Sequence, residues 1–200
     1  MNNELLLEYF KVMHRDLNNF EFKLDSKSAI YVPLLSSAIE HCMSIYFLQK
    51  EYLTSSMYAL VRPAMENYLR AMWVKHSIGD IATDAELSSM HFPKKVEYLI
   101  EQVDRDVPEF NQCNFLQTRL GPLVSNIHDF THGGIQSIAR QYTDGDMLTN
   151  MRDEGEIKSI LKLVVLLSSL AYSEIVQDNV GDHVLKPNEI SKLASELIEL

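Results

Sequence analysis

Apolar residues recur with the 3.6-residue period of an α-helix along most of the chain. A shortage of turn residues, with 7 Gly and 6 Pro among 200 residues, argues against an all-β fold. We therefore predict an all-α helical bundle of six to eight helices that forms a single domain over residues 1–200. The predicted helices cover about residues 3–18, 28–50, 52–77, 94–105, 113–132, 153–178 and 186–200, with further helical stretches at 84–90 and from Ile135 to Tyr142.

The apolar pattern also predicts where these helices lie. Residues 153–178 are apolar around most of the helix circumference, so this helix should be central. Ser28 is expected to cap the helix over residues 28–50, and Pro108 is expected to mark a loop. The terminal amphipathic helix over residues 186–200 could close the core of its own chain or pack against a second chain.

Charge and cysteine content narrow the function classes. A net charge of −10 argues against non-specific DNA binding by the whole surface, which needs clustered Lys and Arg. Cys42 and Cys113 stand singly, so we expect no disulfide scaffold and a cytoplasmic location. The first ten residues lack the features of a signal peptide, and the longest apolar run, Leu163 to Leu167, falls far short of the roughly 20 residues of a membrane span.

One predicted helix carries a charged stripe on an otherwise apolar surface. Arg62, Glu66 and Arg70 follow at four-residue spacing within residues 52–77, so they share one helix face. Such a stripe is either a solvent face with two weak ion pairs or a network in which Glu66 positions a guanidinium for an anion. Pro63 should kink the helix beside Arg62, which favours the second interpretation and places the three side chains toward the interior.

A second candidate group lies at the end of the helix predicted over residues 113–132. His128 and His132 are four residues apart on one face, and His132 precedes two glycines that would let a ligand approach closely. His132 is therefore a candidate general acid or base, with capping of the helix end as the structural alternative. The candidates for ligand binding nearby are Asn126, His128 and Arg140.

Two motifs together resemble a group of uncharacterised bacterial proteins: R-P-x-x-E, which starts at Arg62, and T-H-G-G, which contains His132. That group is similar to the HEPN superfamily, helical domains of many bacterial defence and toxin proteins, and many HEPN members are metal-independent ribonucleases. Their signature pairs an Arg with a His a few residues later. His132 matches the His, but residues 125–127 hold no Arg, so the missing guanidinium would have to come from Arg62, Arg70 or Arg140.

The stretch from His128 to Gln136 is also similar to the metal-binding motif of DinB-like four-helix bundles, which hold a divalent metal through three His. That resemblance implies His128 and His132 as two ligands and His41 as the third. It does not account for the motif at Arg62, so we prefer the HEPN resemblance and predict no metal and no other cofactor.

The HEPN resemblance implies a polar pocket between residues 52–77 and 113–132 that binds RNA or another phosphate-bearing ligand. In an active enzyme, His132 would be the general acid or base, an Arg would stabilise charge on the phosphate, and Glu66 would hold that Arg. The resemblance also implies a homodimer and a phage-defence or toxin–antitoxin context. The alternatives are a DinB-like metalloprotein and a non-enzymatic antitoxin, immunity or scaffold module whose acidic surface contacts a protein partner.

Overall fold

The computed structural model describes residues 3–23, 25–79, 86, 89–124, 138, 142–143, 147–148, 153–178 and 187–199. This part of the chain contains eight α-helices, so the all-α prediction is confirmed. They are α1 (Asn3–Leu17), α2 (Ser28–Lys50), α3 (Thr54–Met72), α5 (Val96–Asp106), α6 (Pro108–Asn111), α7 (Phe115–Arg119), α10 (Glu154–Gln177) and α11 (Pro187–Glu199). The shorter elements are a π-helical turn, η1 (Trp73–Ser77), a 3-10 turn, η2 (Gly121–Leu123), and two antiparallel two-residue strands, β1 (Tyr142–Thr143) and β2 (Met147–Leu148).

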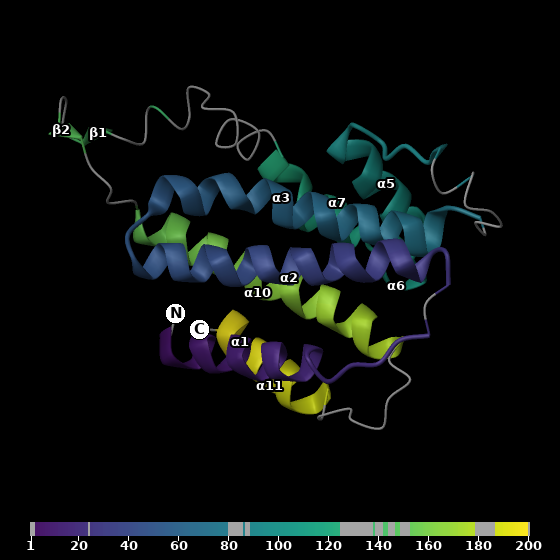
Figure 1. Cartoon of the computed structure of the whole chain (residues 1–200). Coiled ribbons are helices and arrows are strands. Elements are labelled where there is room, and N and C mark those ends of the chain that lie inside the picture. The colour runs from purple at the N-terminus through teal and green to yellow at the C-terminus, as the bar shows by residue number, and fades with distance from the viewer. Residues whose placement is uncertain are drawn as a thin grey trace.

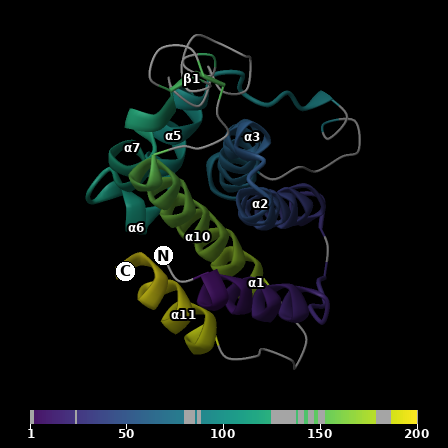
Figure 2. The same cartoon turned by 90° about the vertical axis from the view of Figure 1, so that its left-hand side faces the viewer.

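Three long helices form the centre of the bundle. α2 and α3 lie side by side as an antiparallel pair, and α10 packs along α2 (Figure 1). Figure 2 shows α1 and α11 together on one side of α10 and the shorter helices α5, α6 and α7 on another. Among the described helices, α10 alone is long and apolar enough to cross a membrane, and half of its apolar window is buried within the protein.

The first and last helices dock on α10 through both apolar and polar contacts. The buried Tyr9 hydroxyl lies 2.8 Å from the Ser168 hydroxyl, and the Tyr172 hydroxyl donates to the Asp16 carboxylate at 2.8 Å. The apolar face of α11 packs on α1 and α10 of its own chain, so the terminal helix gives no argument for a dimer. The homodimer and the one-domain organisation stay predictions.

The start of α2 differs from the expectation. The carboxylate of Asp25 accepts a hydrogen bond from the Ser28 N–H at 2.7 Å, and the Ser28 hydroxyl oxygen accepts one from the Asp25 N–H at 2.7 Å. Ser28 is therefore not the cap itself but the second member of a reciprocal pair of the capping-box type. The hydrogen bond from the Ser28 backbone lowers the pKa of Asp25 below its usual value.

The prolines also act differently from the predictions. Pro108 opens the short helix α6 rather than a loop, because the first helical turn leaves its N–H groups unpaired and can accept a residue without one. α3 continues through Pro63 as an α-helix and passes into η1, so the helix predicted over residues 52–77 is confirmed by these two elements together. Gly121-Pro122, where the sequence predicts a bend in the helix over residues 113–132, separates α7 from η2, and residues 125–132 lie outside the described residues.

Candidate functional site

The charged stripe lies on the face of α3 that does not enter the core. The residues beside it, Tyr68, Leu69, Ala71 and Met72, are fully buried. Arg62, Glu66 and Arg70, together with Trp73 at the next helical spacing, are each half-buried. The stripe is therefore neither in bulk solvent nor in the core, so the prediction that the three side chains face the interior is only partly confirmed.

Glu66 is shared between the two guanidiniums. The Arg62 Nε donates to Glu66 Oε1 at 2.6 Å, and the Arg70 Nη2 donates to Glu66 Oε2 at 2.7 Å. The Glu66 side chain is only 15% exposed, so both ion pairs are shielded more than ordinary surface pairs. Two cations share one carboxylate, and no other carboxylate of the described residues pairs with either Arg, which leaves one uncompensated positive charge.

An aromatic pair continues the stripe. The Arg70 guanidinium lies over the Phe92 ring, with Cζ 5.6 Å from the ring centroid, which is the geometry of a cation–π contact. Phe92 in turn packs edge-to-face on Trp73, with the two centroids 6.3 Å apart. Phe92 belongs to the segment that leads into α5, so this segment crosses the stripe at Arg70 and holds that guanidinium on one side while Glu66 holds it on the other.

Of the other predicted site residues, His41 alone lies in the described part of the chain. Asn126, His128, His132 and Arg140 lie outside the described residues, so the predicted pocket between residues 52–77 and 113–132 stays a prediction. His41 is half-buried on α2. In the described ranges, no three His, Cys, Asp or Glu side chains are grouped closely enough to hold a metal ion.

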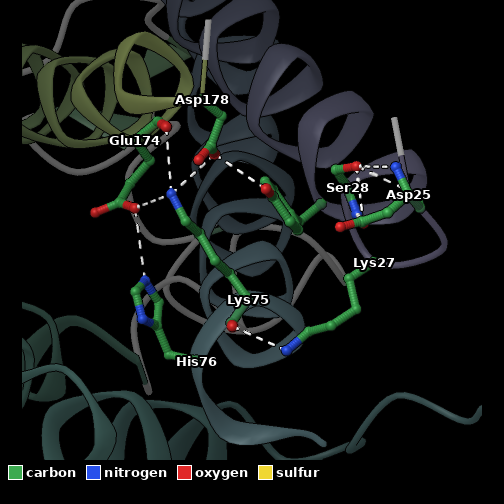
Figure 3. A network of polar contacts seen from close by, with 8 residues as sticks. Asp25, Lys27, Ser28, Lys75, His76, Glu174 and Asp178 are labelled. Carbon is green, nitrogen blue, oxygen red and sulfur yellow. Dashed lines mark hydrogen bonds and ion pairs between the residues drawn. The ribbon is translucent and has the colours of Figure 1, made fainter. Parts of the chain in front are cut away.

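A second polar network lies where the end of α3 meets the end of α10 (Figure 3). The Lys75 ammonium donates to Glu174 Oε2 at 2.8 Å, to Asp178 Oδ2 at 2.9 Å and to the Glu174 backbone carbonyl at 3.3 Å. The Tyr31 hydroxyl donates to the same Asp178 oxygen at 3.0 Å. The His76 Nε2 lies 3.5 Å from Glu174 Oε2. We call these five residues the Lys75 network.

The Lys75 network joins the ends of three helices. The helix formed by α3 and η1 ends here, and so does α10, beside the start of α2. The last carbonyl groups of each helix lack helical hydrogen-bond partners and carry partial negative charge, so they attract cations. Lys75 donates to a carbonyl of the last turn of α10, and Lys27 donates to the carbonyls of Lys75 at 3.1 Å and Ile78 at 2.9 Å. Lys75 therefore caps the end of α10, and Lys27, beside the network, caps the end of η1.

The pKa values of this network follow from its partners. Burial raises the pKa of the Tyr31 hydroxyl, and the hydrogen bond to the charged Asp178 raises it further. Burial alone would raise the pKa of Glu174, but hydrogen bonds from His76 and Lys75 and the charge of Lys75 outweigh it, so that this pKa is lowered. Glu174 is thus held in its charged form.

Our reading of the sequence missed the Lys75 network. Two signals were available in the sequence: the four-residue spacing of Glu174 and Asp178, and the basic residues Lys75 and His76, which lie in η1. Neither signal reveals that the two helix ends meet, since Lys75 and Asp178 are 103 residues apart.

With this geometry in view, the comparisons with known proteins place the chain in a family. The model of a family of unknown function, DUF6988, matches residues 35–176, and the chain belongs to this family. The chain is also 23% identical to Clavesin-1 of Pongo abelii over 140 residues. This match covers 66% of the chain and only 37% of the length of Clavesin-1. No solved structure matches the chain. The family match includes the whole α3 stripe.

Proposed function

For this family member, we propose that the α3 stripe binds a phosphate-bearing ligand and that this ligand is RNA. The observation that supports the proposal is the shared carboxylate: both oxygens of Glu66 are occupied by two guanidiniums, and no other carboxylate of the described residues pairs with either Arg. Among the described residues, this half-buried face therefore carries an excess of positive charge on a chain with a net charge of −10.

The geometry suits phosphate recognition. Arg62 uses its Nε for Glu66, and among the described residues its two terminal nitrogens have no hydrogen-bond partner. The outer edge of a guanidinium presents N–H donors in a fork that matches two phosphate oxygens. Glu66 therefore fixes the orientation of Arg62 while it leaves these donors available to an anion.

The choice of RNA follows from the resemblance to HEPN ribonucleases. In this proposal His132 acts as the general acid or base for cleavage of the phosphodiester, and Arg62 stabilises the charge that develops on the phosphate. A homodimer and a role in bacterial defence or in a toxin–antitoxin pair belong to the same proposal, because they follow from the same resemblance.

RNA binding is tested with a fluorescently labelled single-stranded RNA by fluorescence anisotropy at low ionic strength, where phosphate contacts are strongest. We expect Arg62→Gln to weaken binding about tenfold or more, since it removes charged hydrogen bonds to phosphate. Lys192→Gln removes one exposed positive charge from α11 and is the matched control, for which affinity should stay within about twofold. Absence of binding by the unmodified protein, or equal affinity of both variants, would overturn the proposal.

Cleavage is tested separately, in the presence of EDTA. We expect His132→Ala to abolish cleavage without a loss of RNA affinity, because a general acid or base contributes to the reaction more than to binding. Binding without cleavage in the unmodified protein would assign a binding function without catalysis. A stoichiometric metal that is lost in His128→Ala would instead favour the DinB-like alternative.

A further inference from the structure

The sole tryptophan of the chain continues the charged stripe. Arg62, Glu66, Arg70 and Trp73 follow at spacings of four, four and three residues, so all four lie on one face of the continuous helix formed by α3 and η1. The distance along the helix from Arg62 to Trp73 is about 16 Å at 1.5 Å per residue. The stripe thus passes from guanidiniums to an aromatic surface within the length of a short oligonucleotide.

The packing of the aromatic pair leaves it suited to contact a ligand. Trp73 and Phe92 are both half-buried rather than enclosed in the core, whereas Met72 and Val74 on either side of Trp73 are fully buried. The two rings meet edge-to-face at an interplanar angle of 61°, and Arg70 lies over the Phe92 ring, so the part of the aromatic surface that stays exposed adjoins a guanidinium. Trp73 also opens the π-helical turn η1, and such turns occur often at functional sites.

Charge around Phe92 supports an anionic ligand. Lys94 and Lys95 follow Phe92 directly after Pro93, and both are exposed just before α5 begins. They add two exposed cations close in sequence to Phe92, which contacts Arg70 and Trp73, and Glu97 follows them in the first turn of α5.

We propose that Trp73 and Phe92 form a platform on which a base of single-stranded RNA stacks while Arg62 binds a phosphate of the same strand. This inference rests on the proposed function and extends it to the form of the nucleic acid. Bases in a duplex are already stacked and paired, whereas unpaired bases can stack on aromatic side chains and on Arg. The stripe therefore selects single strands over duplexes.

The fluorescence of Trp73 gives a direct test, because no other tryptophan contributes to the signal. The protein is titrated with a single-stranded RNA oligomer and with an abasic oligomer that has the same number of phosphates. We expect the RNA oligomer to quench the emission in a saturable manner, and the abasic oligomer to bind about tenfold more weakly without quenching, since one stacked base contributes about 1–3 kcal/mol.

Variants separate stacking from phosphate binding, with binding measured by anisotropy of labelled oligomers. Trp73→Leu should reduce the affinity for the RNA oligomer about tenfold, to that of the abasic oligomer, whereas Trp73→Phe should keep most of the affinity because it keeps an aromatic face. Tyr52→Leu removes an exposed aromatic ring at the turn before α3 and serves as the matched control. Circular dichroism confirms that each variant is folded.

The outcomes distinguish this inference from the proposed function. If the RNA and abasic oligomers bind equally well and neither quenches Trp73, the stacking platform is wrong while phosphate binding stands. If neither oligomer binds, both proposals are wrong. A duplex that binds as tightly as the single strand would also overturn the platform.

Discussion

Two networks of charged residues lie along α3 and η1, and they differ in the sign of their excess charge and in how fully the hydrogen-bond donors of their cations are used. In the stripe, two guanidiniums share the one carboxylate of Glu66. In the Lys75 network, one ammonium is held by Glu174 and Asp178, and the three N–H groups of Lys75 have three acceptors within 3.3 Å. In the stripe, Arg62 keeps N–H groups without an acceptor among the described residues. In the Lys75 network, each N–H group of the ammonium has an acceptor.

This difference separates a structural network from one that can serve a ligand. A buried cation whose donors are all satisfied stabilises the helix ends that it joins and offers nothing to a further group. A guanidinium that is oriented by one carboxylate and still has unused N–H groups on a half-buried face is arranged to bind an anion. The two networks should therefore respond to mutation in opposite ways, the Lys75 network in stability and the stripe in binding.

The largest effect is expected from the removal of the Lys75 charge. Lys75→Met keeps the length of the side chain but leaves Glu174 and Asp178 without their cation at two helix ends. We expect the free energy of unfolding to fall by about 2 kcal/mol, less than for a fully buried pair because the side chains are 14–27% exposed. Urea unfolding followed by circular dichroism measures this change.

A double variant provides the control. Glu174→Gln combined with Lys75→Met removes one of the stranded carboxylates, so part of the lost stability should return. If Lys75→Met unfolds at the same urea concentration as the unmodified protein, the Lys75 network does not stabilise the helix ends and the contrast with the stripe disappears.

A smaller effect, visible in its pH dependence, is expected from Glu174→Gln alone. The pKa of Glu174 is lowered in the folded protein from its usual value of 4.5, so its contribution to stability is present above that value and is lost as the pH falls through the lowered pKa. The unmodified protein should therefore be more stable than the variant by about 1 kcal/mol at pH 7, and the difference should shrink toward zero in acid. Unfolding series between pH 7 and pH 3 measure the difference.

The control for this variant is Glu8→Gln, which removes an exposed carboxylate from α1 and therefore corrects for the loss of one negative charge. A stability difference between Glu174→Gln and the unmodified protein that persists unchanged in acid would mean that the charge of Glu174 does not contribute.

The smallest effect on stability is expected from Arg62→Gln. Glu66 keeps Arg70 as a partner and no carboxylate is left without a cation, so the free energy of unfolding should change by only about 0.5 kcal/mol. The same variant should lose most of its RNA affinity. A loss of stability as large as that of Lys75→Met would mean that the stripe, like the Lys75 network, serves to stabilise the fold.

The sequence predicted the long helices well because their signals are local. The spacing of apolar residues, carboxylates in the first turn and proline at the first helical position predicted α10 and α11. Asp153, expected within the first turn of α10, instead caps that helix: its side chain accepts a hydrogen bond from the Glu156 N–H at 2.9 Å. The short elements were harder. Around Pro108 and Gly121-Pro122, turn and helix signals compete within a few residues, and contacts with neighbouring helices decide between them.

The sequence by itself determined that Arg62, Glu66 and Arg70 share one face of a helix, because four-residue spacing fixes this in any α-helix. Only the tertiary structure decided that this face is half-buried and that Phe92 crosses it, since both depend on how the segment before α5 packs on α3. The Lys75 network was decided entirely by tertiary structure. Tyr31, Lys75 and Glu174 come from three helices far apart in sequence, and they meet only because α2, α3 and α10 pack with these ends together. Side-chain spacing within a helix is a local property, whereas the meeting of helix ends depends on the apolar burial that brings whole helices together.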